Sequence, residues 1–422
     1  MRIVGVNKYY YLEGGPERYL LSLAEYLGQR GHEIIPFSVA YPKNLPSEYS
    51  RYFVSPAGSG EEAKLNKLKG GLAVKLRIAA RSIYSMEARR RLETLIDDTK
   101  PDIVYCLNIV NHISPSVIDA AYGRNVPVVL RMSDYYLVCP NYLLLRDGRV
   151  CNDCERGYYH ALHHKCVYGS MAATLTRVVG MYLHKWMGIY KKVGAYVAPT
   201  RYMREILIRG GFEAEKIHYI PTFVNLSDWE PRFDNDGYIL FYGRLSPEKG
   251  VEVLLSAYAQ AGVSEPLLIV GRGYSEDYLE RIKGLASELV GDRVQFLGQK
   301  FGNELREIVR GAKYVVVPSI IPDNAPNVVY ESFAAGKPVI ASNFAGLAEQ
   351  VGQDAGVLVE PGSVEGLAEA MSSLSSDTVA VERLGRAGRN KVETENSIEV
   401  HVDKLMRLFE SLTSGDVLSH SG

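Results

Sequence analysis

Short apolar runs rich in valine and isoleucine alternate with longer amphipathic segments along almost the whole chain. The apolar runs read IVGV, IIPFSV, DIVYCLN, VPVVLRM and AYVAPT in the first half, and YILFYGRL, PLLIVG, RVQFLG, YVVVPS, PVIAS and GVLVEP in the second. Apolar strands separated by helix-length segments predict parallel sheets with helices on both faces. Because this rhythm runs through twice, we expect an α/β protein with two doubly wound, Rossmann-like domains.

The domain boundary should lie where the alternation breaks. The segment NLSDWEPRFDNDG interrupts it with Pro, Asp, Asn and Gly. A length of 422 residues also favours two domains of ordinary size. We expect an N-terminal domain over residues 1–200 and a C-terminal domain over 201–395, with a linker at about 224–237. A last helix at 396–412 should cap the second domain or cross back to the first, and 413–422 should form a flexible tail.

Residues 318–342 read as a buried strand, a polar loop, a short helix, a Gly-Lys-Pro stop and a second buried strand. Pro326 in the first turn of the helix and Gly336 just past its end follow the usual asymmetry of helix start and stop. The helix N-terminus should present its backbone N–H groups, together with Asn324 and Asn327, to a ligand beyond the strand ends. Such an arrangement suits a phosphate or another anion.

Two carboxylates belong to the same segment. Asp323 lies in the entry loop and Glu331 lies inside the helix, eight positions later. This spacing lets one carboxylate reach the far end of a ligand while the other holds a hydroxyl-bearing group nearer the sheet.

A second loop carries two cations. Gly243 ends an apolar strand, Arg244 follows it, and Lys249 stands five residues later, just before a helix. Held at a strand end and a helix start, the two can clamp a diphosphate, the arginine through bidentate hydrogen bonds and the lysine as a point charge. A surface arginine and a Lys-Gly turn would give the same sequence, but the helix start two strands downstream favours the diphosphate site.

Two further loops follow strands of the first half. In YYYLEGGPERYL, Gly14 and Gly15 remove side chains where a helix begins, so that backbone N–H groups can approach a ligand. A tight turn explains this glycine pair equally well. In LRMSDYYLVCPNY, Ser133 and Asp134 stand at the edge of the expected cleft, where either can contact a sugar or polarise an attacking hydroxyl. A hydrogen-bonded loop start is an equal alternative.

Four cysteines lie close together in the sequence with the spacing C-x11-C-x2-C-x11-C, namely Cys139, Cys151, Cys154 and Cys166. A Cys-x2-Cys pair flanked by two further thiols is compatible with a structural tetrahedral zinc ion. Four reduced thiols, or two disulfides, that hold a loop insertion at about 139–166 are the alternative, because the outer spacings are not those of a common zinc module.

The charge pattern gives little guide to partners. The balance of 48 Lys+Arg against 49 Asp+Glu argues neither for nor against a polyanion, and we expect no nucleic acid partner. Residues 64–91 are basic and suit an anionic membrane surface, although a solvated helix face is the commoner reason for such a run. No apolar run reaches the length of a membrane span, and MRIVGV enters a strand directly. We therefore expect no signal peptide and a cytoplasmic location, with membrane contact at most peripheral.

Together these segments resemble the GT-B glycosyltransferases, specifically the retaining enzymes of family 4 (glycosyl transferases group 1). GGPE, PDIVYCLN, APTRYMREIL…IHYIPTFVN, GRLSPEKG and the D-x7-E segment with FAAGKPVIAS occur in the family's order over nearly the whole chain, and the last two are the most specific. The resemblance implies two domains that face a cleft, with a UDP- or GDP-linked sugar donor on the C-terminal domain. The acceptor, a glycan, a lipid-linked glycan or a small molecule, would bind to the N-terminal domain.

The family's functional residues can be carried over to this sequence. The resemblance implies that Arg244 and Lys249 bind the donor diphosphate and that Glu331 holds the ribose hydroxyls. It also implies that the helix N-terminus near Asn327 and Val328 meets the phosphates and the sugar.

Two positions depart from the family's pattern. The family usually has glutamate where this chain has Asp323. The resemblance implies that Asp323 reaches sugar hydroxyls, and we expect its shorter side chain to affect the choice of donor. Many members carry His-Asp where this chain has Ser133-Asp134, so the chemistry on the acceptor side is the less determined part.

The resemblance implies a reaction without a metal or other catalytic cofactor. The leaving diphosphate takes the developing negative charge and accepts the proton of the acceptor hydroxyl, which gives attack from the front face with retention. Two alternatives stay open. A nucleotide-sugar 2-epimerase would share the architecture but needs acid–base carboxylates and histidines around the sugar. A catalytically weak pseudoenzyme that binds a sugar nucleotide is compatible with the missing histidine.

Overall fold

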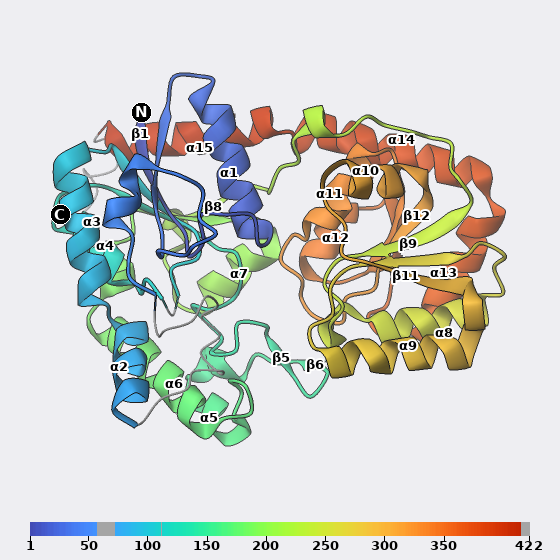
Figure 1. The fold of residues 1–422 in the computed structure, drawn as a ribbon, viewed down its shortest axis with the longest axis horizontal. Coiled ribbons are helices and arrows are strands. Elements are labelled where there is room, and N and C mark those ends of the chain that lie inside the picture. The colour runs from blue at the N-terminus through green and yellow to red at the C-terminus, as the bar shows by residue number, and fades with distance from the viewer. Residues whose placement is uncertain (57–71, 111, 415–422) are drawn as a thin grey trace.

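The protein forms two lobes, each built on a parallel sheet with helices on both faces (Figure 1). The computed structural model describes residues 1–56, 72–110 and 112–414, and within 72–76 it describes the backbone only. Two doubly wound α/β domains were expected from the alternation of apolar and amphipathic segments, and this prediction is confirmed.

The first lobe contains a six-stranded sheet with the order β2-β1-β3-β4-β7-β8, all strands parallel. Its strands are β1 (Arg2–Val6), β2 (Glu33–Phe37), β3 (Ile103–Cys106), β4 (Val128–Arg131), β7 (Ala195–Ala198) and β8 (Ile217–Tyr219). Apolar side chains alternate between the two faces, so Val4 and Val6 belong to one core cluster while Ile3 belongs to another. The helices around this sheet are α1 (Gly15–Gly28), α2 (Leu72–Ile83), α3 (Met86–Thr99), α4 (Ser116–Tyr122) and α7 (Arg201–Arg209).

The second lobe repeats this plan with the strand order β11-β10-β9-β12-β13-β14. Its strands are β9 (Tyr238–Tyr242), β10 (Leu267–Val270), β11 (Val294–Gly298), β12 (Ala312–Val317), β13 (Val339–Ser342) and β14 (Gly356–Val359). Its helices are α8 (Val251–Ala261), α9 (Glu276–Val290), α10 (Gly302–Gly311), α11 (Asn327–Ala334), α12 (Ala345–Val351), α13 (Val364–Ser376) and α14 (Thr378–Glu395). The chain leaves β9 toward β10 on one side and later returns to β12 on the other. The switch point of this sheet therefore lies between β9 and β12, where open α/β sheets bind ligands.

The first sheet extends past the expected boundary at residue 200. Strand β8 is the last strand of this sheet, and helix α7 connects β7 to it. The second sheet begins only with β9. Strand β8 has the sequence IHY. Because its central residue, His218, is polar, the search for apolar runs did not identify this strand. The expected linker at 224–237 lies between the two sheets.

The last helix, α15 (Ile398–Thr413), crosses back to the first lobe (Figure 1). Leu405 and Phe409 share an apolar cluster with Ile3, Tyr105 and Val129 of the first sheet. Of the two alternatives considered for the helix at 396–412, crossing back is therefore the one observed. Most of the tail expected at 413–422 lies outside the described residues, which end at 414.

A long segment, called the insertion below after the sequence prediction, separates β4 from β7 in the first lobe. It contains the hairpin β5 (Leu145–Arg146) and β6 (Arg149–Val150), and the helices α5 (His160–His164) and α6 (Met171–Trp186). In Figure 1 these helices lie at the lower edge of the first lobe, and the hairpin extends toward the second.

The basic segment at 64–91 is described only in part, because residues 64–71 lie outside the described ranges. Three of its arginines are close to carboxylates. Arg89 pairs with Glu93, while Arg81 and Arg91 both lie near Glu87. Over the described ranges, no helix is both long enough and apolar enough to cross a bilayer.

Candidate active site

The loops that follow β9 and β12 are held against each other at the switch point of the second sheet. Gly250 has a φ of 70°, and a Cβ at this position would lie 2.0 Å from the carbonyl oxygen of Pro318. Only glycine tolerates both the left-handed backbone and this close approach. The N–H of Ile320 also donates to the carbonyl of Glu248 at 3.0 Å.

This contact brings two predicted site residues together. The ammonium group of Lys249 forms an ion pair with the carboxylate of Asp323. Ser319 donates to the same carboxylate oxygen at 2.9 Å. The ion pair is mostly shielded from solvent, with 24% of the lysine side chain and 14% of the aspartate side chain exposed.

Helix α11 begins at Asn327 and has Pro326 at its N-cap, one position before the first turn in which the sequence placed it. The carbonyl of Val328 accepts a hydrogen bond from the hydroxyl of Tyr242, the last residue of β9, at 2.8 Å. Gly336 follows the helix with a φ of 76°, as expected for a C-terminal stop. The start of α11 is thereby fixed next to the end of β9.

Glu331 is the most enclosed carboxylate of the site, with 6% of its surface exposed. Burial raises its pKa, and the nearby guanidinium of Arg18 opposes this shift. Arg18 belongs to α1 of the first lobe and forms an ion pair with Glu331 across the cleft. The sequence did not single out Arg18, because only the placement of the two lobes brings it to α11.

The glycine pair of the first lobe lies against the start of α11. A Cβ on Gly15 would lie 3.6 Å from the side-chain nitrogen of Asn327. Gly14 is the N-cap of α1, and its φ of −158° is an extended conformation that any residue adopts. The start of α1 thus lies within van der Waals distance of Asn327, but a Cβ would fit at either glycine.

Asn324 joins the two lobes. Its side-chain oxygen accepts a hydrogen bond from Thr200 at 3.2 Å, and its nitrogen donates to the carbonyl of Met132 at 3.2 Å. In this arrangement the side-chain amide of Asn324 hydrogen-bonds to the first lobe. The contact with a phosphate, for which the sequence singled out Asn324, stays a prediction. The next residue, Ala325, has a φ of 57°, which is uncommon for a residue with a side chain.

A second contact between the lobes lies beside Asn324. The carboxylate of Glu349, on α12, accepts hydrogen bonds from the backbone N–H groups of Arg201 and Tyr202 at 2.7 Å each. An anion at the first turn of α7 complements the helix dipole. Sequence reasoning missed Glu349, since α7 and α12 belong to different lobes.

Arg244 is exposed and forms no ion pair with any described residue. Gly243 before it has a φ of 145°, and nothing lies within 4 Å of the position that a Cβ would take there. The charge of Arg244 lowers the pKa of Tyr142, against a larger upward shift caused by burial. Tyr142 belongs to the insertion, so the insertion reaches the neighbourhood of this predicted diphosphate ligand.

Ser133 and Asp134 follow β4, next to Met132 and its contact with α11's entry loop. Ser133 accepts a hydrogen bond from Arg131 at 3.2 Å. Asp134 accepts one from the N–H of Tyr136 at 2.9 Å. Burial raises the pKa of Asp134 to about 6, although this hydrogen bond and the charge of Arg177 both oppose the shift.

The four clustered cysteines are free thiols in the insertion, namely Cys139, Cys151, Cys154 and Cys166. Burial raises the pKa of Cys139 to about 11, and the nearby Cys166 and Cys151 add to the shift. Throughout the described ranges, no group of three or more His, Cys, Asp or Glu side chains is placed to hold a metal ion. The structural zinc site therefore stays a prediction from the spacing.

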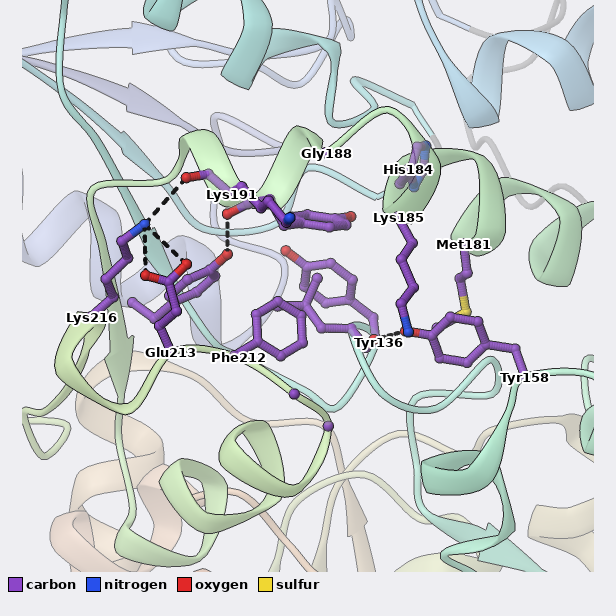
Figure 2. Close-up of a pocket in the computed structure, with 15 residues that line it drawn as sticks. Tyr136, Tyr158, Met181, His184, Lys185, Gly188, Lys191, Phe212, Glu213 and Lys216 are labelled. Atoms are coloured by element: carbon purple, nitrogen blue, oxygen red, sulfur yellow. Dashed lines mark hydrogen bonds and ion pairs between the residues drawn. The ribbon is translucent and has the colours of Figure 1, made fainter. Parts of the chain in front are cut away.

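A cavity of about 150 Å³ lies in the first lobe, between the insertion, α6 and α7. Figure 2 shows Tyr136, Tyr158 and Phe212 around it, with Lys185 and Lys216 at its sides. Lys249, Asp323 and Glu331 do not line this cavity. Tyr136 does line it, and its N–H donates to Asp134, so the cavity lies beside the loop after β4.

Comparison with known families accounts for both lobes. The sequence profile of Glycosyltransferase Family 4 matches residues 13–228, and that of Glycosyl transferases group 1 matches residues 226–391. The chain belongs to glycosyltransferase family 4. The resemblance inferred from GGPE, GRLSPEKG and the D-x7-E segment is thus confirmed.

Among curated relatives, a GDP-mannose-dependent monoacylated alpha-(1-6)-phosphatidylinositol monomannoside mannosyltransferase of Corynebacterium glutamicum is 29% identical over 52% of this chain and 64% of its own length. A phosphatidyl-myo-inositol mannosyltransferase of Mycobacterium leprae is 32% identical over 46% of this chain and 54% of its own length. This chain thus spans less than two thirds of either relative.

Solved structures share the fold over the whole chain. A sucrose-phosphate synthase from Thermosynechococcus elongatus has a TM-score of 0.72 and 21% identity, and covers 98% of this chain and 99% of its own. Anabaena Alr3699/HepE, solved with UDP and glucose, has a TM-score of 0.67 and 16% identity, and covers 97% of this chain and 100% of its own. The GT-B architecture expected from the sequence is confirmed.

Proposed function

We propose that this protein is a retaining, metal-independent glycosyltransferase that moves a sugar from a nucleoside-diphosphate sugar to a hydroxyl of a glycan, a lipid-linked glycan or a small molecule. The observation that carries the proposal is the convergence of Lys249, Glu331 and the start of α11 at the switch point of the second sheet, opposite Gly15 of the first lobe. A cation, a buried carboxylate and free helical N–H groups match a diphosphate and a ribose.

The donor would occupy this switch point with its parts in a defined order. Glu331 accepts hydrogen bonds from the ribose hydroxyls, and Lys249 and Arg244 neutralise the diphosphate. The sugar extends from the start of α11 toward Asp323 and the first lobe. Glycosyltransferase structures solved with UDP-glucose or UDP share this fold, which supports a nucleotide-sugar donor.

The transfer needs no protein nucleophile in this scheme. The bond between the anomeric carbon and the diphosphate oxygen breaks, and the oxygen leaves with the nucleotide. The acceptor oxygen forms the new bond on the same face, and its proton passes to the departing diphosphate. Lys249, Arg244 and the dipole of α11 stabilise the negative charge that develops there. Contact between the lobes excludes water, which would otherwise hydrolyse the donor.

Two ion pairs show what the donor must displace. Lys249 is paired with Asp323, and Glu331 with Arg18. Lys249 and Glu331 are thus each paired with a protein group until phosphates and ribose hydroxyls replace it. Separation of Arg18 from Glu331 would open the cleft at the position that the ribose occupies.

The acceptor side is formed by the loop after β4 and by the part of the insertion around Tyr142. Asp134 lies next to the contact between the lobes and has a raised pKa, which suits a group that exchanges hydrogen bonds with a sugar hydroxyl. The monoacylated phosphatidylinositol mannoside named for one relative supports a lipid-linked acceptor among the three classes. We place the reaction in the cytoplasm, where nucleotide sugars are available.

A donor screen tests the proposal. Thermal unfolding of the protein is followed with UDP-, GDP- and ADP-sugars, because a ligand that binds only the folded state raises the melting temperature. The stabilising donor is then incubated with acceptors, with and without EDTA, and release of nucleoside diphosphate and the anomeric configuration of the product are measured. An epimerised nucleotide sugar formed without acceptor would indicate an epimerase, and binding without turnover would indicate a pseudoenzyme.

Site variants assign the activity to this cleft. We expect Lys249→Ala to lower kcat/KM by about 100-fold, as for the loss of one charge-stabilising group. Glu331→Ala should chiefly weaken donor binding. The matched control is Lys283→Ala on α9, whose side chain pairs with the neighbouring Glu280 on the surface. Unchanged transfer rates in both site variants would contradict the proposal.

A further inference from the structure

Helix α6 has an apolar face that points to solvent. The exposed side chains on this face have relative exposures from 38% to 84% and are Met171, Leu175, Val179, Tyr182, Leu183 and Trp186. Their spacing of three and four residues places them on one side of the helix. A surface helix of a water-soluble domain normally shows the opposite arrangement, with its polar side outward.

Contacts with α2 fix the orientation of α6. A Cβ on Gly180 would lie 3.2 Å from Ile83, and His184 hydrogen-bonds to the carbonyl of Ile83 at 2.7 Å. Thr174 and Val178 are also buried on this inner side. Because the inner side is held in this way, the helix cannot turn its apolar face into the lobe.

Trp186 is the most exposed of these side chains, with 84% of its surface accessible. Burial of large apolar side chains stabilises a protein, so a contiguous row of them that stays in water forgoes that stabilisation. Contiguous exposed apolar surface of this kind marks an interaction site.

The positive charge around α6 indicates which kind of partner its apolar face would bind. Residues 157–190, which include α6, contain the basic residues Lys165, Arg177 and Lys185 and no Asp or Glu, although the chain has 49 acidic residues in total. Lys165 and Lys185 are exposed and form no ion pair with a described residue. The sequence of α2, which packs on α6, likewise contains basic but no acidic residues.

We propose that the outward face of α6 lies in the interfacial layer of an anionic lipid bilayer. Trp and Tyr prefer the headgroup level, where the ring is buried and the polar atom stays hydrated, which fits Trp186 and Tyr182. Lys and Arg around the helix then meet anionic headgroups. A second copy of the chain would fit less well, since a two-fold contact would bring two basic surfaces together.

The apolar face of α6 lies beside the basic segment at 64–91, which includes α2 and whose arginines at 81, 89 and 91 lie near carboxylates. Helix α6 has 16 residues, and no described helix is suited to span a bilayer, so α6 would lie along the membrane surface. Where the proposed function holds, this docking would place the cleft beside a lipid-linked acceptor. The docking itself does not depend on the proposed function.

Vesicle binding of the full chain tests the docking. We expect co-sedimentation with vesicles of phosphatidylcholine and phosphatidylglycerol, weaker binding to phosphatidylcholine alone, and release at high salt. Leu183→Ser with Trp186→Ser should weaken binding at least about tenfold. The matched control replaces two exposed apolar residues of the second lobe, Phe301→Ser with Val379→Ser, and should bind like the unmodified protein.

Fluorescence locates the contact. The chain has two tryptophans, and Trp229 is already buried, so a blue shift of emission on adding vesicles should come from Trp186 and disappear in Trp186→Phe. Equal vesicle binding by the double variant and the unmodified protein would overturn the proposal. So would a dimer in light scattering that dissociates on Leu183→Ser with Trp186→Ser, without any vesicle binding. Release of nucleoside diphosphate in solution should be unchanged in these variants, which separates this test from that of the proposed function.

Discussion

Arg18 of α1 and Glu331 of α11 form an ion pair that joins the two lobes across the cleft. The carboxylate is almost fully buried, and the arginine is the group that opposes the upward shift of its pKa. Glu331, which we propose binds the donor ribose, is thus paired with a residue of the opposite lobe before the donor binds. Donor binding and the contact between the lobes are therefore coupled through one carboxylate.

Replacement of Arg18 should make donor binding depend on pH. In Arg18→Met the pKa of Glu331 rises further, since burial is no longer opposed by the guanidinium. As the pH falls, the carboxylate becomes protonated and loses an acceptor for the ribose hydroxyls, so donor affinity should decline more steeply than in the unmodified protein. At pH 8, where the carboxylate is ionised, the variant should bind at least as tightly, because the competing cation is absent.

Calorimetric titration of the donor between pH 6 and pH 8 measures this difference. Arg30→Met, two residues past the end of the same helix, is the control, because that arginine stacks on Tyr26. Much weaker binding by Arg18→Met at pH 8 would show instead that Arg18 holds the donor directly.

Gly250 should tolerate no side chain. In Gly250→Ala the methyl group meets the carbonyl of Pro318 at a position only 2.0 Å away, and the φ of 70° adds its own strain. Gly262→Ala is a matched control, since its φ is 63° and nothing lies within 4 Å. We expect a loss of about 1–2 kcal/mol in the control from backbone strain alone. Gly250→Ala should lose at least about 2 kcal/mol more, because overpacking adds to that strain.

The measurement is thermal unfolding of both variants, combined with donor affinity. Displacement of the Lys249 loop should also weaken donor binding in Gly250→Ala but not in Gly262→Ala. Equal melting temperatures in the two variants would mean that the loops after β9 and β12 are not packed as described.

The sequence was sufficient for the parts of the site that lie within one lobe. Strand, loop and helix around Asp323 and Glu331 follow from local apolar runs and from Pro326 and Gly336, which act over a few residues. The Arg18–Glu331 pair could not be predicted, because it depends on how the two lobes are placed relative to each other. Glu349 was missed for the same reason. The outward apolar face of α6 was also missed. Periodicity identifies the apolar face of a helix, but it does not show whether that face points into the protein or to solvent.

The charged form of Asp134 should lower the free energy of unfolding of the protein. Its pKa is about 6 in the folded protein against a usual value of 3.8, so folding favours the protonated form. The penalty is absent below the usual pKa, grows as the pH rises from 3.8 to 6, and is complete above that. Asp134→Asn should therefore raise the melting temperature more at pH 8 than at pH 5. Asp147→Asn, whose side chain is 91% exposed, should show no such difference.

His401 should give the opposite dependence on pH. It belongs to α15, where its ring hydrogen-bonds to the Tyr19 hydroxyl at 2.6 Å and to the carbonyl of Pro221 at 2.6 Å. Burial lowers its pKa to about 3 from 6.5, so the folded protein holds the neutral ring. The unfolded chain takes up a proton as the pH falls below 6.5, and stability contributed by the neutral ring is lost progressively toward pH 3.

His401→Ala tests this network. At pH 7.5 we expect a loss of about 2–4 kcal/mol, because Tyr19 and the carbonyl of Pro221 each lose a buried partner. At pH 5 the difference between variant and unmodified protein should shrink, since the unmodified protein then carries the cost of keeping His401 neutral. Thermal unfolding at both pH values measures the two differences. A gap that stays constant or widens at pH 5 would show that His401 is protonated in the folded protein, in which case α15 would be held to the first lobe by a charged group.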